Sequence, residues 1–299
     1  MFLPGNFFRC VVCDATQLVI GEAEWSCSEC STIYPVERGI PLLVRDSRSH
    51  LERLARAAEE NPEWYVVEHP AEEESPWRHH LRKRRLFVES VLRNYLNGHD
   101  GRVADELLDL ACGDGQNLAF LSQFTSDLYG CDYNPVRLAR AESNRSTSVE
   151  PTLFLGDVLD MPVGDSSFEI VFFNHGLEHI AEDERALANL YRILAPGGLL
   201  ILGTPNEGAW WWRLAYKLEP EIRRSTDHVQ FYTSASLVEK MTGQGFRIIQ
   251  TEHMGWGPPH WKLDYFVRRY KLVDDFFEFV GRRLFKKQAS SLYVIATKD

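Results

Sequence analysis

Short, nearly continuous apolar runs alternate with amphipathic stretches through the middle and the last part of the chain. Such a run is typical of a strand buried on both faces, whereas apolar residues at helical spacing indicate a helix. The alternation therefore predicts an α/β fold built on a largely parallel sheet. We interpret 107–110, 128–132, 153–158, 167–174, 199–202, 246–252 and 291–298 as strands, and 117–124, 183–194 and 234–244 as helices.

Two regions depart from this alternation. Residues 47–100 are charged and helical in pattern, and we expect a linker or lid; the basic run 78–85 within it is either a solvated helix face or a phosphate-binding patch. Residues 254–290 form an insertion with one long apolar helical stripe, flanked by lysines and arginines. We predict a small module over 1–46, a helical linker over 47–100 and the main domain over 101–299.

Composition narrows the function only slightly. The 299 residues are 44% hydrophobic and 25% charged, which is ordinary for a soluble protein. The net charge of −10 argues against broad nucleic-acid binding by a uniformly basic surface. No apolar run reaches the roughly 18 residues of a membrane span, and Pro4 and Gly5 interrupt an N-terminus without a basic start. We therefore expect no signal peptide and a cytoplasmic protein with reduced thiols.

The first predicted strand runs directly into a small turn, Ala111-Cys112-Gly113-Asp114-Gly115, followed by a predicted helix. Glycines let a ligand approach the backbone, and the helix N-terminus favours an anionic group. A dinucleotide site would need a third glycine where Leu118 stands, and a P-loop would need Gly-Lys-Ser/Thr. A nucleoside ligand of another kind remains, and the alternative is a tight turn without a ligand.

Acidic residues follow two further strands. Asp132 ends the second strand, where it can accept both hydroxyls of a ribose, and Asp157 ends the third, where it can accept an adenine amino group. Helix capping or turn formation is the alternative for each acid. Together with Asp109, they form a series at successive strand ends that capping alone does not explain.

These features resemble motif I and the later motifs of class I S-adenosylmethionine-dependent methyltransferases, with Ala111 in place of the first glycine of the motif. The segments 177–179, 204–206 and 227–233 are similar to the subgroup that contains the ubiquinone-biosynthesis O-methyltransferase. The resemblance implies a Rossmann-like seven-stranded sheet whose last strand is antiparallel. It also implies S-adenosylmethionine as cofactor, held by Asp109, Ala111, Gly113, Gly115, Asn117, Asp132, Tyr133, Asp157, Val158 and Asn174.

Four of the six cysteines lie near the N-terminus, as Cys10-x-x-Cys13 and Cys27-x-x-Cys30. Two such pairs can bind one tetrahedral Zn²⁺ with no open position, which is typical of a structural site. Disulfides and four unrelated thiols are the alternatives. The tail of this module, 33–44, resembles Trm112-like zinc ribbons.

The predicted reaction is in-line transfer of the sulfonium methyl group to an acceptor oxygen or nitrogen. Removing a hydroxyl proton suits an imidazole near neutral pH, and we expect His179 first, then His175 and His228. Polar capping is the alternative for His175 and His179. The resembling subgroup has E-x-x-E-H here and is thought to hold a divalent metal; His175 replaces the first acid, which weakens the case for a metal.

The acceptor is predicted less sharply than the cofactor. We favour a small hydrophobic or lipid-linked molecule, such as a sugar, quinone or polyketide-like compound, over an RNA base gripped by the zinc module or a non-enzymatic adaptor. The aromatic cluster Trp210-Trp211-Trp212 with Tyr216, expected in the loop after the fifth strand, and the insertion 254–290 either cap the domain, line the acceptor pocket or contact a membrane surface peripherally.

Overall fold

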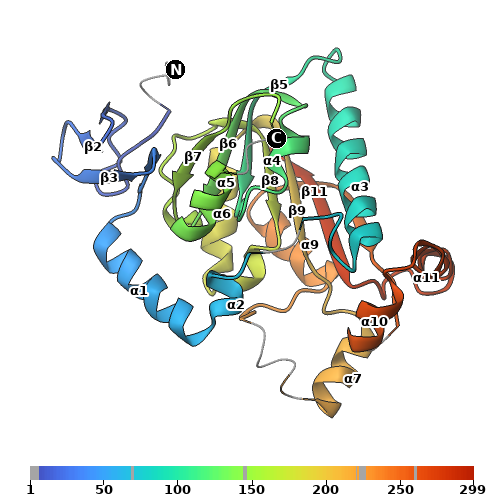
Figure 1. Cartoon of the computed structure of the whole chain (residues 1–299). Helices are drawn as coiled ribbons and strands as arrows, with labels where there is room; N and C mark the ends of the chain where they lie inside the picture. Colours follow the sequence, from blue (N-terminus) through green and yellow to red (C-terminus); the bar gives the residue numbers. More distant parts are fainter. Residues whose placement is uncertain (1–6, 69–70, 144–146, 220, 222–226, 259–260) are drawn as a thin grey trace. The chain divides into compact units, whose positions relative to one another are not determined.

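The computed structural model describes residues 7–68, 71–143, 147–219, 221, 227–258 and 261–299 (Figure 1). The stretch 1–6, on which the expected absence of a signal peptide rests, lies outside these residues. Within the described part of the chain, no helix combines the length and the apolar character that crossing a membrane would require.

One sheet has seven strands, in the order β10-β11-β9-β8-β5-β6-β7. β5 pairs in parallel with β6, and β6 with β7, whereas β11 runs antiparallel to both β9 and β10. This arrangement confirms the predicted Rossmann-like α/β sheet with an antiparallel last strand. The strands are β5 (Ala104–Leu110), β6 (Thr125–Asp132), β7 (Thr152–Leu155), β8 (Phe168–Asn174), β9 (Leu194–Pro205), β10 (Arg247–Met254) and β11 (Ser291–Thr297).

The chain forms two compact units, the first of which comprises Met1–His69, Val103–Phe172 and Ala188–Gly198. Its parallel strands are buried on both faces, as their apolar runs predict, and Leu107 and Leu108 are fully buried. Helix α5 packs against β6 and β7. Helix α1 begins after Asp46, whose carboxylate accepts the Ser49 N–H at 3.0 Å and so caps the helix. The helices here are α1 (Ser47–Glu60), α2 (Pro62–Tyr65), α4 (Leu118–Leu121) and α5 (Pro135–Ser143).

The N-terminal module of the first unit is a four-stranded antiparallel sheet, β1-β2-β3-β4. It joins the edge of the larger sheet, because the Leu43 N–H donates to the Leu155 carbonyl of β7 at 2.9 Å. The Phe8 ring packs edge-on against Phe154, and Phe7 stacks on Tyr129 at 4.5 Å. The module therefore shares the core of the first unit. Its strands are β1 (Leu18–Ile20), β2 (Glu24–Cys27), β3 (Ile33–Glu37) and β4 (Ile40–Pro41).

The second unit comprises Pro70–Arg102, Phe173–Leu187 and Leu199–Asp299. Helix α9 packs against β10 and β11 and begins with a capping box, in which Thr233 and Ser236 bond reciprocally. Helix α11 packs against α3. The helices here are α3 (Arg78–Asn97), α7 (Trp210–Leu218), α9 (Ser234–Gly243), α10 (Trp261–Val267) and α11 (Lys271–Leu284), while α6 (Asp183–Ile193) belongs partly to each unit.

Three predicted elements differ from the observed ones. The insertion has two helices, because the buried Arg268 side chain turns to Asp274 at 2.9 Å and Tyr270 is extended between α10 and α11. The aromatic cluster expected in a loop forms helix α7. The helix predicted over 117–124 is only the single turn α4. Apolar spacing continues through all three places and does not report where a helix begins or ends.

The basic run 78–85 is neither an open phosphate patch nor simply a solvated face. Lys83 forms ion pairs with Asp274 and Asp275 of α11 at 2.6 and 2.9 Å, and Arg78 donates to the Arg269 carbonyl at 2.9 Å. Arg85 pairs with Glu72 and Glu89. Much of the run thus attaches neighbouring segments of the second unit to α3.

Candidate functional site

The turn after β5 has the backbone conformation that its glycines predict. Gly113 and Gly115 have φ angles of +55° and +78°, and Ala111 is also left-handed at +57°. A Cβ on Gly115 would lie 2.9 Å from the Cβ of Ala141, so close packing requires glycine there as well. Ala111 accepts the strain that the family's glycine would avoid.

Asp132 closes this turn. One carboxylate oxygen accepts the Gly113 N–H and the other accepts the Asn134 N–H, both at 2.8 Å. The side chain is 8% exposed, and burial raises the pKa of Asp132 despite these two donors. The structure thus brings the predicted ribose acid and the glycine turn into direct contact.

Asp109 lies on β5 just before the turn and is 1% exposed. Neither carboxylate oxygen has a hydrogen-bond partner among the described residues. Burial, and then the charge of Asp132, raises the pKa of Asp109 well above its usual value. A buried carboxyl group without partners is costly and calls for a donor from a ligand or water.

The other predicted cofactor residues of the first unit surround the same strand ends. Asp157 accepts the Leu159 N–H at 2.9 Å, so the capping contact that we left open is present, and Val158 beside it is buried. The Tyr133 carbonyl lies 2.8 Å from Nε2 of His50 on α1. Asn117 precedes α4 without capping it through its side chain.

Asn174 lies in the second unit, at the end of β8, and takes part in a separate network. Its side-chain oxygen accepts hydrogen bonds from Arg84 at 3.1 Å and from the Tyr293 hydroxyl at 3.0 Å. Arg84 also donates to that hydroxyl at 2.8 Å. Sequence reasoning considered Arg84 only as part of the basic run 78–85 and did not consider Tyr293, and it missed their contact because they come from distant segments.

The three predicted histidines gather in the second unit. Nδ1 of His175 lies 3.2 Å from the buried Glu178 carboxylate, and Nδ1 of His179 lies 3.1 Å from Asp227. The rings of His179 and His228 are 5.0 Å apart, nearly perpendicular. Glu178 is held by the Thr204 hydroxyl, which donates to it at 3.1 Å.

The electrostatic environment separates the roles of these histidines. Burial alone would lower the pKa of His179, but Asp227 and Glu178 outweigh it and the pKa is raised. Burial, followed by the charge of Arg84, lowers the pKa of His175, and burial lowers that of His228. At neutral pH, His175 and His228 are therefore the neutral imidazoles that can accept a proton.

The same cluster has the geometry to hold a cation. One ligand atom each from Glu178, His179 and His228 lies within 4.8 Å of the others, and Asp227 orients His179 from behind. Two imidazoles and a carboxylate form a common donor set for divalent transition metals. His175, which replaces the first acid of the E-x-x-E-H pattern, contacts Glu178 instead of adding a carboxylate.

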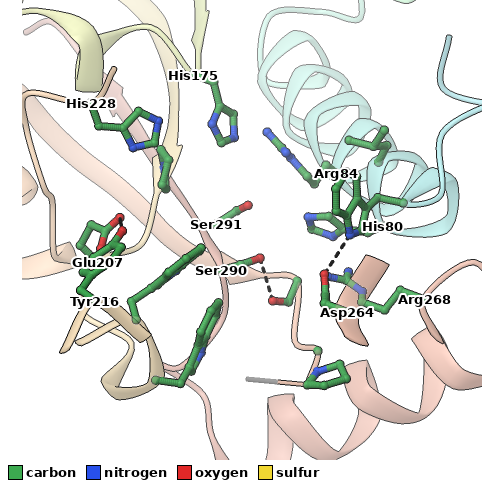
Figure 2. Close-up of a pocket in the computed structure, with 18 residues that line it drawn as sticks. His80, Arg84, His175, Glu207, Tyr216, His228, Asp264, Arg268, Ser290 and Ser291 are labelled. Carbon is green, nitrogen blue, oxygen red and sulfur yellow. Dashed lines mark hydrogen bonds and ion pairs between the residues drawn. The ribbon is translucent and has the colours of Figure 1, made fainter. Parts of the chain in front are cut away.

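A pocket of about 380 Å³ opens beside this cluster (Figure 2). His175 and His228 lie on one side of it, and Arg84 and His80 lie on the other. His179 does not line the pocket, although we expected it first among the catalytic candidates. Asp264 and Arg268 reach the pocket from the insertion, a contribution that the apolar stripe gave no means of predicting.

Aromatic side chains form one wall of the pocket. Trp211 and Trp212 stack at 4.4 Å, and Tyr216 continues the stack at 5.6 Å from Trp212. Glu207 accepts the Tyr216 hydroxyl at 2.9 Å and holds this ring in place. Such a wall suits a flat, apolar ligand, with polar groups nearby to orient it.

The four N-terminal cysteines converge on one point. Sγ of Cys10 lies 3.5 Å from Sγ of Cys30, and Sγ of Cys13 lies 3.6 Å from Sγ of Cys27. All four sulfur atoms are within 4.8 Å of one another, and none forms a disulfide. The Tyr34 hydroxyl lies 3.0 Å from the Cys10 sulfur and adds a polar contact at the edge of the cluster.

Comparisons with known proteins agree with the fold. Residues 108–202 match the methyltransferase domain family. The chain is 34% identical over 130 residues to an uncharacterized 37.1 kDa protein in transposon TN4556 of Streptomyces fradiae, covering 40% of this chain and 37% of that one. It is 32% identical over 136 residues to the demethylmenaquinone methyltransferase of Thermus thermophilus, covering 44% and 58% respectively. The chain thus spans less than two thirds of these curated relatives.

A solved structure extends the likeness of fold beyond the matched domain. The PH0226 protein of Pyrococcus horikoshii superposes with a TM-score of 0.51 at 18% identity, covering 73% of this chain and 91% of that one. The match over 108–202 places a methyltransferase domain within this chain, and the seven-stranded sheet has the Rossmann-like fold of class I methyltransferases.

Proposed function

We propose that this protein transfers the methyl group of S-adenosylmethionine to a hydroxyl oxygen of a small hydrophobic acceptor. One observation carries the choice of acceptor: a pocket with a stacked aromatic wall has His175 and His228 on its lining. The methyltransferase domain supplies the cofactor chemistry, and the pocket combines an apolar surface with groups that can accept a proton.

In this proposal the first unit binds the cofactor. Asp132 accepts the ribose hydroxyls, Asp157 and Val158 receive the adenine, and the turn 111–115 lies against the methionyl part. The buried Asp109, whose oxygens lack partners among the described residues, accepts or donates a hydrogen bond there. A cradle of this kind supplies alignment, because the sulfonium already activates the methyl group.

The acceptor reacts in a single displacement. The acceptor oxygen attacks the methyl carbon while the carbon–sulfur bond breaks, and S-adenosylhomocysteine leaves. The hydroxyl proton passes to His228 or His175, which burial keeps neutral, and then to solvent. His179, whose pKa Asp227 and Glu178 raise and which does not line the pocket, orients the cluster instead of accepting the proton.

The acceptor class follows from the aromatic wall. A planar ring with a hydroxyl group, free or on a lipid-linked molecule, would stack on Trp211 and Trp212 and direct its oxygen toward the histidines. A curated relative named as a demethylmenaquinone methyltransferase supports a quinone-like ring. The subgroup likeness of 177–179 and 227–233 supports it as well.

For the N-terminal module we propose a structural Zn²⁺ held by Cys10, Cys13, Cys27 and Cys30. A zinc–sulfur bond of about 2.3 Å in a tetrahedron separates the sulfur atoms by about 3.8 Å. The observed separations of 3.5 and 3.6 Å fit this value. Zinc binding would stabilise a module whose strands have two to five residues each.

The test incubates the protein with cofactor carrying a labelled methyl group and with cell extract divided into lipid, small-molecule and RNA fractions. We expect label in the lipid or small-molecule fraction. Label in the RNA fraction that is released by a nuclease would instead establish the RNA alternative. Calorimetry without detectable cofactor binding would establish the adaptor alternative and contradict the proposal.

A double variant and a matched control then test the proposed general base. His228→Ala with His175→Ala should lower kcat on the labelled acceptor by about 100-fold or more while leaving cofactor affinity unchanged. His99→Ala, which changes an exposed histidine at the end of α3, is the matched control and should behave as wild type. Unchanged kcat in the double variant would eliminate both imidazoles as the base.

A further inference from the structure

Helix α11 has an unusual orientation of its apolar residues. Leu272, Phe276 and Phe279 follow one another at i, i+4 and i+7 and are 83%, 60% and 59% exposed. A surface helix of a globular protein normally turns such a stripe toward the core. We call these three residues the outer stripe of α11.

The inner side of α11 is fixed by polar contacts instead. Asp274, 1% exposed, pairs with Arg268 and with Lys83 of α3. Gly281 lies against the Trp256 ring so closely that a Cβ would come within 2.0 Å of it. These contacts set the rotation of the helix, so the outer stripe cannot turn inward without breaking them.

Other apolar residues of the insertion are exposed as well. Leu263, Phe266 and Tyr270, on and just after α10, are each at least half exposed, and so are Leu284 and Phe285 at the end of α11. Exposed apolar residues in this number, with a stripe along two turns of α11, mark a contact with another molecule or a membrane.

The charge of this region indicates which partner covers it. Residues 261–287 contain eight lysines and arginines against four aspartates and glutamates, a net +4 in a chain of net −10. Some of the cations neutralise these acids: Arg268 pairs with Asp264 and Asp274, Lys271 with Asp275, and Arg282 with Glu278. The exposed cations Arg283, Lys286 and Lys287 lie outside the ion pairs of the described residues, and they are the charges available to an anionic partner.

The cations also lie beside the exposed rings. The guanidinium of Arg283 lies over the Phe279 ring at 4.7 Å, and that of Arg269 lies over Phe266 at 5.0 Å. Lys286 and Lys287 follow as exposed residues at the C-terminal end of α11. Aromatic and aliphatic side chains surrounded by Arg and Lys are typical of helices that lie in the headgroup region of a bilayer.

We propose that the outer stripe of α11, with the exposed residues of α10 and the adjoining cations, docks on an anionic lipid bilayer. The helix is about 21 Å long at 1.5 Å per residue, which suits lying in the surface and not crossing it. The docking does not depend on the acceptor assigned above. If that assignment holds, α10 connects the two sites, because Asp264 lines the pocket while Phe266 faces outward.

The test is co-sedimentation of the full chain with phosphatidylcholine vesicles, with and without phosphatidylglycerol. We expect binding to the anionic vesicles that weakens as salt rises. Phe276→Ser with Phe279→Ser should reduce the partition coefficient about tenfold or more. Arg283→Gln with Lys286→Gln and Lys287→Gln, which leaves the apolar residues intact, should do the same.

Leu86→Ser, which changes an exposed leucine on α3, is the matched control and should bind as wild type. Asp132→Asn should also bind vesicles as wild type does. This variant distinguishes a loss of methyl transfer from a loss of docking. Equal binding by wild type and both surface variants, or no binding at all, would overturn the proposal. The proposal would also be overturned if the surface variants kept their vesicle binding but lost RNA binding or dimerisation.

Discussion

Gly115 meets two requirements for glycine, a left-handed backbone and close packing, and a comparison with Gly197 separates them. Its φ of +78° is strained for any residue with a Cβ, and the Cβ would also meet Ala141 at 2.9 Å. We expect Gly115→Ala to lower the free energy of unfolding by about 2–4 kcal/mol, from backbone strain plus overpacking. Cofactor affinity should fall with it. Urea denaturation and calorimetry measure the two effects.

The control for this variant is Gly197→Ala. Gly197 has nearly the same φ, +76°, but nothing lies within 4 Å of a Cβ placed there. Only the backbone cost of about 1–2 kcal/mol should appear, without loss of cofactor binding. Equal destabilisation by the two variants would mean that the contact with Ala141 relaxes freely.

His80 gives the second unit a predicted sensitivity to acid. It is 5% exposed, and burial, with Arg268 and Arg84, lowers its pKa well below the usual value; His175 and Lys83 act in the same direction. The unfolded chain therefore binds a proton below about pH 6.5 that the folded chain does not, so stability falls as pH falls. His80→Gln should remove up to about 1.4 kcal/mol of this loss per pH unit.

Urea denaturation at pH 7, 6 and 5 checks this expectation. His99→Gln, at an exposed position, should keep the wild-type dependence on pH. The comparison isolates His80, because every other buried histidine is common to the variants. Parallel curves for His80→Gln and wild type would contradict the assignment.

At the scale of elements, the strands were the most predictable part of the fold. Each apolar run from 107–110 to 167–174 forms a parallel or central strand. A strand that is buried on both faces needs apolar residues at nearly every position, so its sequence is easy to recognise. The glycine turn and the acid at the end of β6 could be predicted too, since their contact follows from adjacent parallel strands. Local sequence patterns are enough to predict site residues that lie directly at the carboxyl ends of parallel strands.

The insertion could not be predicted in the same way. Its apolar spacing gave the helical character of α10 and α11 but neither the break at Arg268 nor the outward direction of Phe276. The break goes with the contact of Arg268 and Asp274, which apolar spacing does not report, and the outward direction depends on long-range pairs such as Lys83 with Asp274, which are almost 200 residues apart. The pocket residues Trp77 and Asp264 escaped prediction for the same reason.

The cysteine module leads to a prediction about the whole first unit. If the proposed zinc holds the module, Cys27→Ser should lose bound zinc and lower the Tm of that unit, because Phe8 and Leu43 join the module to β7 and its neighbours. Elemental analysis and calorimetry measure the two quantities. Cys131→Ser, at a buried thiol outside the module, should keep its zinc whatever its Tm.

Across the whole molecule, charge is distributed unevenly, and this bears on the choice among functions. A net −10 overall with +4 over 261–287 concentrates cationic character on the surface beside the exposed phenylalanines. In the basic run 78–85, Lys83 and Arg85 form ion pairs, and Arg78 and Arg84 donate hydrogen bonds to neutral groups of the second unit. Among the described residues, the basic surface of the insertion is local and partly apolar, which favours a lipid interface over an RNA groove.

The last prediction concerns the proposed roles of the two units, cofactor binding in the first and acceptor binding in the second. Asp132→Asn removes a charged acceptor from the proposed ribose site, and its affinity for S-adenosylmethionine should fall about 10- to 150-fold, as for a lost charged hydrogen bond. Trp211→Ala removes part of the aromatic wall and should raise KM for the acceptor about tenfold while leaving cofactor affinity unchanged. Because Asp132 belongs to the first unit and Trp211 to the second, we expect their effects on kcat/KM to be multiplicative in the double variant. Kinetics with both substrates varied measure this, and a double variant no worse than Asp132→Asn alone would mean that Trp211 acts only through cofactor binding.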